Sequence, residues 1–129
     1  MGSSKGNGMT TISLPWPSPD LSPNGRNHWA KKAKAVKAAR EAAHWLTWTH
    51  IGRNMGWQRV SVSVTFCPPD RRRRDLDGMI GSHKAAQDGI ADALGCDDSK
   101  FECSYRIGEP VKGGAVLVEI KPLAAASAA

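Results

Sequence analysis

Long apolar runs are missing from this sequence of 129 residues. None of its apolar segments approaches the roughly 18 consecutive residues that a membrane-spanning helix needs. The first residues also lack the charged-then-apolar order of a secretion signal. We therefore expect no membrane partner for this chain.

Cysteine is also scarce, with three residues at Cys67, Cys96 and Cys103. The odd number and the absence of any CxxC spacing exclude a disulfide framework and are typical of a reducing compartment, so the sequence predicts a cytoplasmic protein. A zinc site built from these cysteines and His83 would match no common ligand spacing, and we do not expect one.

Acidic residues are almost absent from one part of the chain. Between Arg26 and Arg59 there are eight basic residues and one acid, Glu41, whereas eight of the twelve acids lie between Asp70 and Glu102. The net charge of +6 favours an acidic partner, with nucleic acid ahead of an anionic membrane. A basic arm before an acid-rich segment suits a metal-dependent enzyme acting on a polyanion, although a random distribution of surface charge is the alternative.

The chain is long enough for one domain with a hydrophobic core of its own. Turn-rich segments divide it into expected strands at 10–16, 59–67, 101–107 and 115–120, and expected helices at 27–50 and 80–94. The β-α-β-α-β-β order predicts an α+β domain with one mixed sheet and both helices on one face. The segment GEPVKGG is expected to join the last two strands like a hairpin.

The expected domain covers residues 10–121, between a flexible N-terminal segment (1–9) and a low-complexity tail (122–129). Apolar stripes of helical spacing are expected to face the core, namely Trp29, Ala33, Val36, Ala43 and Leu46 in the first helix and Ile80, His83, Ala86, Ile90 and Leu94 in the second. Trp45 and Trp48 point elsewhere. Packing under a loop is the simpler interpretation of these two rings, and a subunit interface is the alternative.

The stretch PPDRRRRDLDGM (68–79) follows directly on the alternating strand RVSVSVTFC. If the extended backbone continues, Asp75 and Asp77 leave the same face and their carboxylates converge. A divalent cation would remove their repulsion, and Mg²⁺ is usually held by one or two carboxylates. The alternative is a solvated charge run on a loop.

More acids follow the second helix at Asp97 and Asp98, and a helical return would bring them back to the same edge. Capping or turn formation would explain either residue alone. On the helix itself, Lys84, Asp88 and Asp92 follow i, i+4, i+8 spacing and share a face. Lys84 could stabilise charge at a scissile phosphate, but spacing alone favours a surface ion pair with Asp88.

Taken in order, ISLPW, PDRRRRDLD, KAAQDGIADAL and DDS resemble the RusA family of Holliday-junction resolvases over residues 10–121. The resemblance implies a homodimeric, Mg²⁺-dependent endonuclease, with Mn²⁺ as a substitute, that nicks four-way DNA junctions symmetrically in recombination and repair. It also implies a nucleoid-associated protein of a bacterial or phage-infected cell, with no small-molecule substrate.

By this resemblance Asp75, Asp77 and Asp98 match the three catalytic aspartates of the family, and Lys84 matches its essential lysine. Arg74 matches an arginine beside the acid pair. These matches reverse the preference for Lys84 as a mere ion-pair partner. The chain departs from the family at Gly78, where many members have asparagine, so it lacks a side chain that could fix the neighbouring carboxylate. Lys84 also follows Asp77 by seven residues, more than in some members and similar to phage-type ones.

The expected chemistry is metal-assisted hydrolysis, with Asp75, Asp77 and Asp98 as ligands of one or two Mg²⁺ ions. Basic side chains are expected to follow the DNA backbone without reading sequence, namely Arg71, Arg72, Arg73, Arg74, Lys31, Lys32, Lys34 and Lys37. A nuclease for flaps, forks or RNA-containing branches and a branched-DNA-binding module without catalysis are the alternatives. A basic structural protein would leave the ordered acids unexplained.

Overall fold

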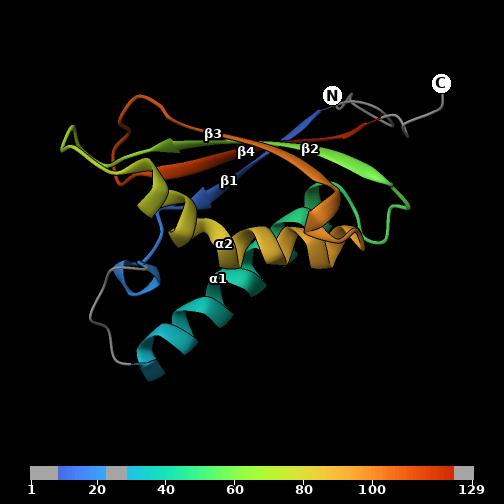
Figure 1. Ribbon diagram of the computed structural model, residues 1–129, viewed down its shortest axis with the longest axis horizontal. Coiled ribbons are helices and arrows are strands. Elements are labelled where there is room, and N and C mark those ends of the chain that lie inside the picture. Colours follow the sequence, from blue (N-terminus) through green and yellow to red (C-terminus); the bar gives the residue numbers. More distant parts are fainter. Residues whose placement is uncertain (1–8, 23–28, 124–129) are drawn as a thin grey trace.

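Four strands form one open sheet, and two helices cover one of its faces (Figure 1). The computed structural model describes residues 9–22 and 29–123. The strands are β1 (Thr10–Pro15), β2 (Arg59–Cys67), β3 (Phe101–Ile107) and β4 (Ala115–Leu123); the helices are α1 (Trp29–His50) and α2 (Leu76–Leu94), with the short 3₁₀ helices η1 (Pro19–Leu21) and η2 (Asp98–Lys100). The predicted α+β domain with a mixed sheet is confirmed.

The sheet has the order β1-β4-β2-β3, with β3 parallel to β2 and the other pairs antiparallel. The expected hairpin between β3 and β4 is therefore wrong, because β2 lies between these two strands. Helix α2 carries the chain from β2 to β3 on one side, as a parallel pair requires. The segment after β3 then brings β4 to the opposite side of β2, turning at Gly113 and Gly114, whose φ angles are 79° and 73°.

The alternation of β2 places Val60, Val62, Val64 and Phe66 in the core, where each is at most 1% exposed. β4 fills the middle of the sheet, where Val118 pairs with Ile12 on one side and Val64 on the other. The inner faces of these strands meet the buried side of α2, which confirms the strand pattern and the second helical stripe.

The stripe expected for α1 is correct only in its second half. Ala43 is buried, but Trp29 and Ala33 are exposed. Figure 1 shows the reason, since the first turns of α1 extend away from the sheet and from α2. The residues 27 and 28, with which this helix was expected to begin, lie outside the described part of the chain.

The two helices approach each other most closely at Gly89 of α2. A Cβ atom at this position would overlap the backbone oxygen of Arg40 and lie 3.0 Å from the backbone nitrogen of His44. One turn further, the guanidinium of Arg40 binds the carboxylate of Asp92, with Nε and Oδ2 2.7 Å apart. A glycine and an ion pair thus fix the contact between α1 and α2.

Among the described residues, two boundaries differ from the expected ones by more than one residue. α2 begins at Leu76, four residues early, because Asp75 caps it: its Oδ2 accepts a hydrogen bond of 3.2 Å from the backbone N–H of Gly78. β4 continues to Leu123, two residues past the expected end of the domain. In the described residues, neither helix has the combination of length and apolar character that crossing a membrane requires.

Candidate functional site

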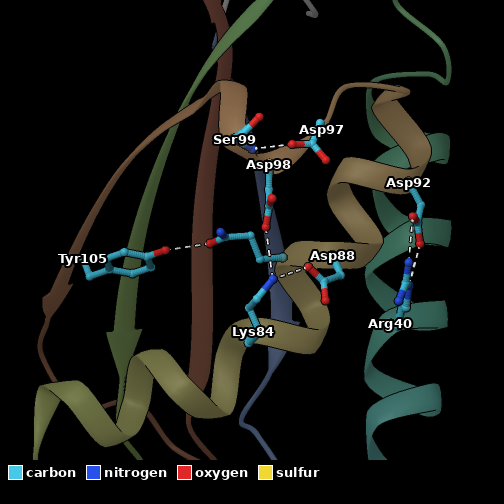
Figure 2. Close-up of polar contacts among 9 residues, drawn as sticks. Arg40, Lys84, Asp88, Asp92, Asp97, Asp98, Ser99 and Tyr105 are labelled. Atoms are coloured by element: carbon cyan, nitrogen blue, oxygen red, sulfur yellow. Dashed lines mark hydrogen bonds and ion pairs between the residues drawn. The ribbon is translucent and has the colours of Figure 1, made fainter.

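Lys84 lies between two carboxylates on the outer face of α2 (Figure 2). Its Nζ donates to Oδ1 of Asp88 at 2.6 Å and to Oδ2 of Asp98 at 3.0 Å. Asp88 follows one turn later on the same helix, whereas Asp98 begins η2, after the chain has turned back at Gly95. The helical return therefore brings Asp98 to Lys84, and the surface ion pair with Asp88 forms as well.

The hydrogen bonds from Lys84 to Asp88 and then to Asp98 raise the pKa of the lysine above its ordinary value. Its side chain is 61% exposed, so the cation remains accessible from solvent. The site thus presents a charged ammonium at the surface, held from two sides by acids of separate chain segments.

The two adjacent aspartates after α2 have different roles. Asp97 is the N-cap of η2, and its Oδ2 accepts from the backbone N–H of Ser99 at 2.9 Å. Hydrogen bonds from the side chain and backbone of Ser99 lower the pKa of Asp97. The capping explanation therefore applies to Asp97, while the side chain of Asp98 is directed at Lys84 (Figure 2).

Tyr105 and Gln87 flank the site on the side of β3. The Tyr105 hydroxyl donates to Oε1 of Gln87 at 2.7 Å, and the tyrosine ring stacks on Phe66. Burial, followed by the hydrogen bond with Cys103, raises the pKa of Tyr105 to about 12. Sequence reasoning missed this pair; the only signal was that Gln87 lies one turn after Lys84 and that Tyr105 is the single tyrosine.

Asp75 and Asp77 do not form the expected convergent pair. The backbone leaves the extended region after Asp75 (φ −90°, ψ 121°), and Asp77 belongs to the first turn of α2. Side chains two apart in a helix diverge by about 200°. The assumption of a continuing strand was therefore wrong, because the capping aspartate starts a helix at this point.

Asp77 precedes Lys84 by seven residues, so helical periodicity puts both on the same side of α2, about 10 Å apart along the axis. Among residues 9–22 and 29–123, no three His, Cys, Asp or Glu side chains are close enough to hold a metal ion together. Asp75, Asp77 and Asp98 supply the oxygen ligands that Mg²⁺ prefers, but in this arrangement they do not fit one shared ion. The same finding applies to a zinc site from His83 and the cysteines.

The four arginines of the charged stretch separate into two groups. Arg74 is only 16% exposed; its NH1 group binds Oδ1 of Asp70 at 2.9 Å, and its guanidinium lies 5.4 Å from the centre of the Trp16 ring. The hydrogen bond from Arg74 and the backbone N–H of Arg72 lower the pKa of Asp70 to about 2. Arg71, Arg72 and Arg73 are exposed and accessible to a polyanion.

The four expected DNA-binding lysines lie along the exposed first half of α1: Lys31, Lys32, Lys34 and Lys37. In the second half of this helix, Trp45 and Trp48 are 59% and 38% exposed. Packing under a loop is therefore wrong for Trp45, whereas Arg53, from the segment after α1, lies over the Trp48 ring and covers part of it. The lysines and tryptophans belong to α1, and the candidate site belongs to α2 and η2.

No protein-family model matches the sequence. The chain is 41% identical over 121 residues to an uncharacterized protein of Xylella fastidiosa (strain Temecula1), an alignment that covers 87% of this chain and 76% of that protein. An identity of this level over most of both chains shows common descent. The chain belongs to the same family as this Xylella fastidiosa protein.

Proposed function

We propose that the protein is a structure-specific DNA endonuclease of the RusA type, which resolves four-way junctions by paired symmetric nicks as a homodimer. The observation that carries the proposal is the placement of Lys84 between Asp88 and Asp98. Two residues that the resemblance assigns to catalysis, Lys84 and Asp98, thus touch each other although they come from different segments.

Lys84 has the properties required of a cation that stabilises charge on a phosphate. The two carboxylates raise its pKa, so it carries a positive charge at neutral pH, and its position is fixed by two hydrogen bonds. A positioned cation stabilises the charge that develops during phosphodiester cleavage. Its exposure leaves room for a DNA backbone to approach from the solvent side.

The proposed requirement for Mg²⁺ is supported by the RusA resemblance alone, because Asp75, Asp77 and Asp98 do not fit one shared ion in this arrangement. Asp77 shares the face of α2 that carries Lys84, but Asp75 is engaged in capping the helix. We propose that each of these three aspartates is required for cleavage, so that its replacement by a neutral residue abolishes nicking.

Basic side chains would hold the DNA backbone near this site. Arg71, Arg72 and Arg73 are exposed, and the lysines of α1 add to a chain of net charge +6. Contacts of this kind release counterions, so the affinity for DNA is expected to fall steeply with salt. We exclude Arg74 from the DNA contacts, because it is engaged with Asp70 and Trp16.

The test is Mg²⁺-dependent cleavage of a synthetic mobile four-way junction, with the products examined for symmetric nicks that a ligase can reseal. Asp75→Asn should abolish nicking and leave junction binding intact. Glu119→Gln, an exposed acid on β4, is the matched control and should cleave normally. Equal cleavage of the junction and of plain duplex would reject resolution, and preferred cleavage of flaps or forks would indicate the broader nuclease.

The separation of Asp75, Asp77 and Asp98 favours a second candidate, a module that binds branched DNA without cutting it. A wild-type protein that binds the junction but remains inert with both Mg²⁺ and Mn²⁺ would decide for this candidate. Cleavage that Asp75→Asn removes would decide against it.

A further inference from the structure

Trp45 and Trp48 form an exposed aromatic pair near the end of α1. Their ring centroids are 5.4 Å apart and the rings meet edge to face at 74°. They point away from Ala43 and Thr47, the two residues of this helix that are fully buried in the core. Helix α1 packs against α2 and β1 on the same face of the sheet, and the exposed fractions of Trp45 and Trp48, 59% and 38%, show that solvent reaches both rings.

The side of α1 that carries the two rings is also basic. Helical periodicity places Lys34 within about 20° of Trp45 around the axis, and Lys31 within about 40°. Within α1 there are five basic residues, Lys31, Lys32, Lys34, Lys37 and Arg40, and one acid, Glu41. Lys37 borders the hollow beside the tryptophans, and Lys31 and Lys34 lie further along α1 at the rim of a second hollow toward η1.

Neighbouring side chains hold the rings in place without burying them. The guanidinium of Arg53 lies 4.4 Å from the centre of the Trp48 ring, and the His44 ring meets Trp48 edge to face. A hollow of about 440 Å³ beside the two tryptophans is bordered by Lys37, by Glu41 and by the ion pair of Arg40 with Asp92. Trp45 thus remains the more open of two oriented rings, and neither contributes to the core.

We propose that Trp45 and Trp48, together with Lys31, Lys34 and Lys37, bind unpaired nucleotides, with bases stacking on the rings and phosphates meeting the lysines. A row of cations next to exposed aromatic rings is the arrangement by which proteins hold single-stranded nucleic acid without reading its sequence. Charge complementarity separates this partner from a second copy of the chain. A second copy carries the same net charge of +6 and offers no excess of negative charge to the lysines, whereas a nucleic-acid backbone does.

This inference rests on the proposed function in one respect, because an opened junction centre, a flap or a fork is the part of branched DNA that would present unpaired bases. It adds a surface outside the candidate site, on a different helix from Lys84. Its test is therefore a binding measurement without cleavage.

Binding of fluorescently labelled oligodeoxythymidylate to the full chain is measured by anisotropy in EDTA, at two salt concentrations. Trp45→Ala should weaken the affinity by about tenfold or more, the loss expected from one stacked base. Trp29→Ala is the matched control, since Trp29 is 77% exposed on nearly the opposite side of α1 and should change the affinity less than twofold. Trp45→Phe should retain most of the binding, and circular dichroism confirms that each variant is folded.

Binding of a fully paired duplex distinguishes base stacking from phosphate contacts. Its bases are not free to stack on the ring, so Trp45→Ala should leave duplex binding unchanged. The inference is overturned if Trp45→Ala binds the oligonucleotide as Trp29→Ala does. It is also overturned if Trp45→Ala converts a dimer into a monomer in light scattering, which would assign this face to a second copy. If oligonucleotide binding depends on Trp45 but the protein cuts no junction, the proposed nuclease function alone is refuted. If the protein cuts junctions but oligonucleotide binding does not depend on Trp45, this inference alone is refuted.

Discussion

The Lys84 ammonium and the Asp98 carboxylate lie 3.0 Å apart although fourteen residues separate them in the chain. α2 carries the lysine, and the turn that ends this helix returns the aspartate to it. The ion pair joins α2, the helix that connects β2 to β3, to η2, the short helix that follows it. The position of the cation therefore depends on the fold of the whole segment from β2 to β3.

Replacing Lys84 tests its proposed role at the phosphate. Lys84→Met removes the charge but keeps most of the aliphatic length, and we expect junction cleavage to fall by at least about 100-fold. Binding of the junction should change only a few-fold, because many other basic groups contact the backbone. Single-turnover cleavage and anisotropy binding measure the two effects, and cleavage by Lys84→Met at the wild-type rate would contradict the assignment.

Asp88 is expected to position Lys84 rather than to act on DNA. Asp88→Asn removes the strongest of the hydrogen bonds that raise the lysine pKa, so this pKa should fall toward its ordinary value. We expect cleavage to drop about tenfold, less than on loss of Lys84. NMR titration of the lysine side chains gives the pKa, and Asp88→Glu should rescue both properties.

Asp92→Asn is the matched control for this change, since Asp92 lies one turn further on α2 and binds Arg40 instead. It should leave the Lys84 pKa unaltered. If Asp88→Asn and Asp92→Asn lowered the Lys84 pKa equally, the acidic face of α2 as a whole would set this pKa and Asp88 would have no specific role in positioning Lys84.

Gly89 sets the distance between α1 and α2. In Gly89→Ala the new methyl group would overlap the Arg40 backbone oxygen, so we expect the free energy of unfolding to fall by about 2–3 kcal/mol. Chemical denaturation measures this change. Gly78→Ala is the control: its Cβ would meet Asp75 Oδ2 at an ordinary 3.6 Å, and alanine favours a helix by up to about 1 kcal/mol. A stable Gly89→Ala protein would show that the helices can separate without cost.

His83 predicts a dependence of stability on pH. The imidazole is buried against Phe66, and burial lowers its pKa from 6.5 to about 4. Between pH 6.5 and pH 4 the His83 imidazole is protonated in the unfolded chain but neutral in the folded chain. The unfolding free energy should therefore decrease as the pH falls from 6.5 to 4. The total contribution of this group is about 3 kcal/mol.

Denaturation at several pH values checks this slope. His83→Leu should remove most of it, whatever the substitution does to stability at neutral pH, and His50→Gln, at the exposed end of α1, should keep it. A wild-type protein whose stability is flat from pH 6.5 to pH 4 would show that the buried imidazole is not held neutral.

The sequence predicted the features that depend on local periodicity. The alternation of Val60, Val62 and Val64 gives the inner face of β2, and the stripe ending at Leu94 gives the buried side of α2. Strand pairing was not predictable in this way. Turn residues after β3 suggest a hairpin, but the pairing is decided by which side of β2 each strand can occupy.

The candidate site was predicted in part. A helical return was expected to bring Asp97 and Asp98 back to the edge of Asp75 and Asp77, and the structure places Asp98 beside Lys84. The helical return was not enough to place Asp75, because an aspartate can continue a loop or cap a helix, and only the backbone N–H of Gly78 decides between them. The exposure of Trp45 depends on how α1 packs against the rest of the protein, which the residue pattern of this helix alone does not predict.

The position of β4 has a consequence for how the protein is made. Among the four described strands β4 comes last in the sequence, yet it lies between β1 and β2 and pairs with both. In the described sheet β1 pairs with β4 alone, so it cannot join the sheet until β4 has been synthesised, whereas β2, α2 and β3 can associate before that. A stop codon before Ala115 would leave a crossover unit holding Lys84 and Asp98, with β1 unable to join the sheet.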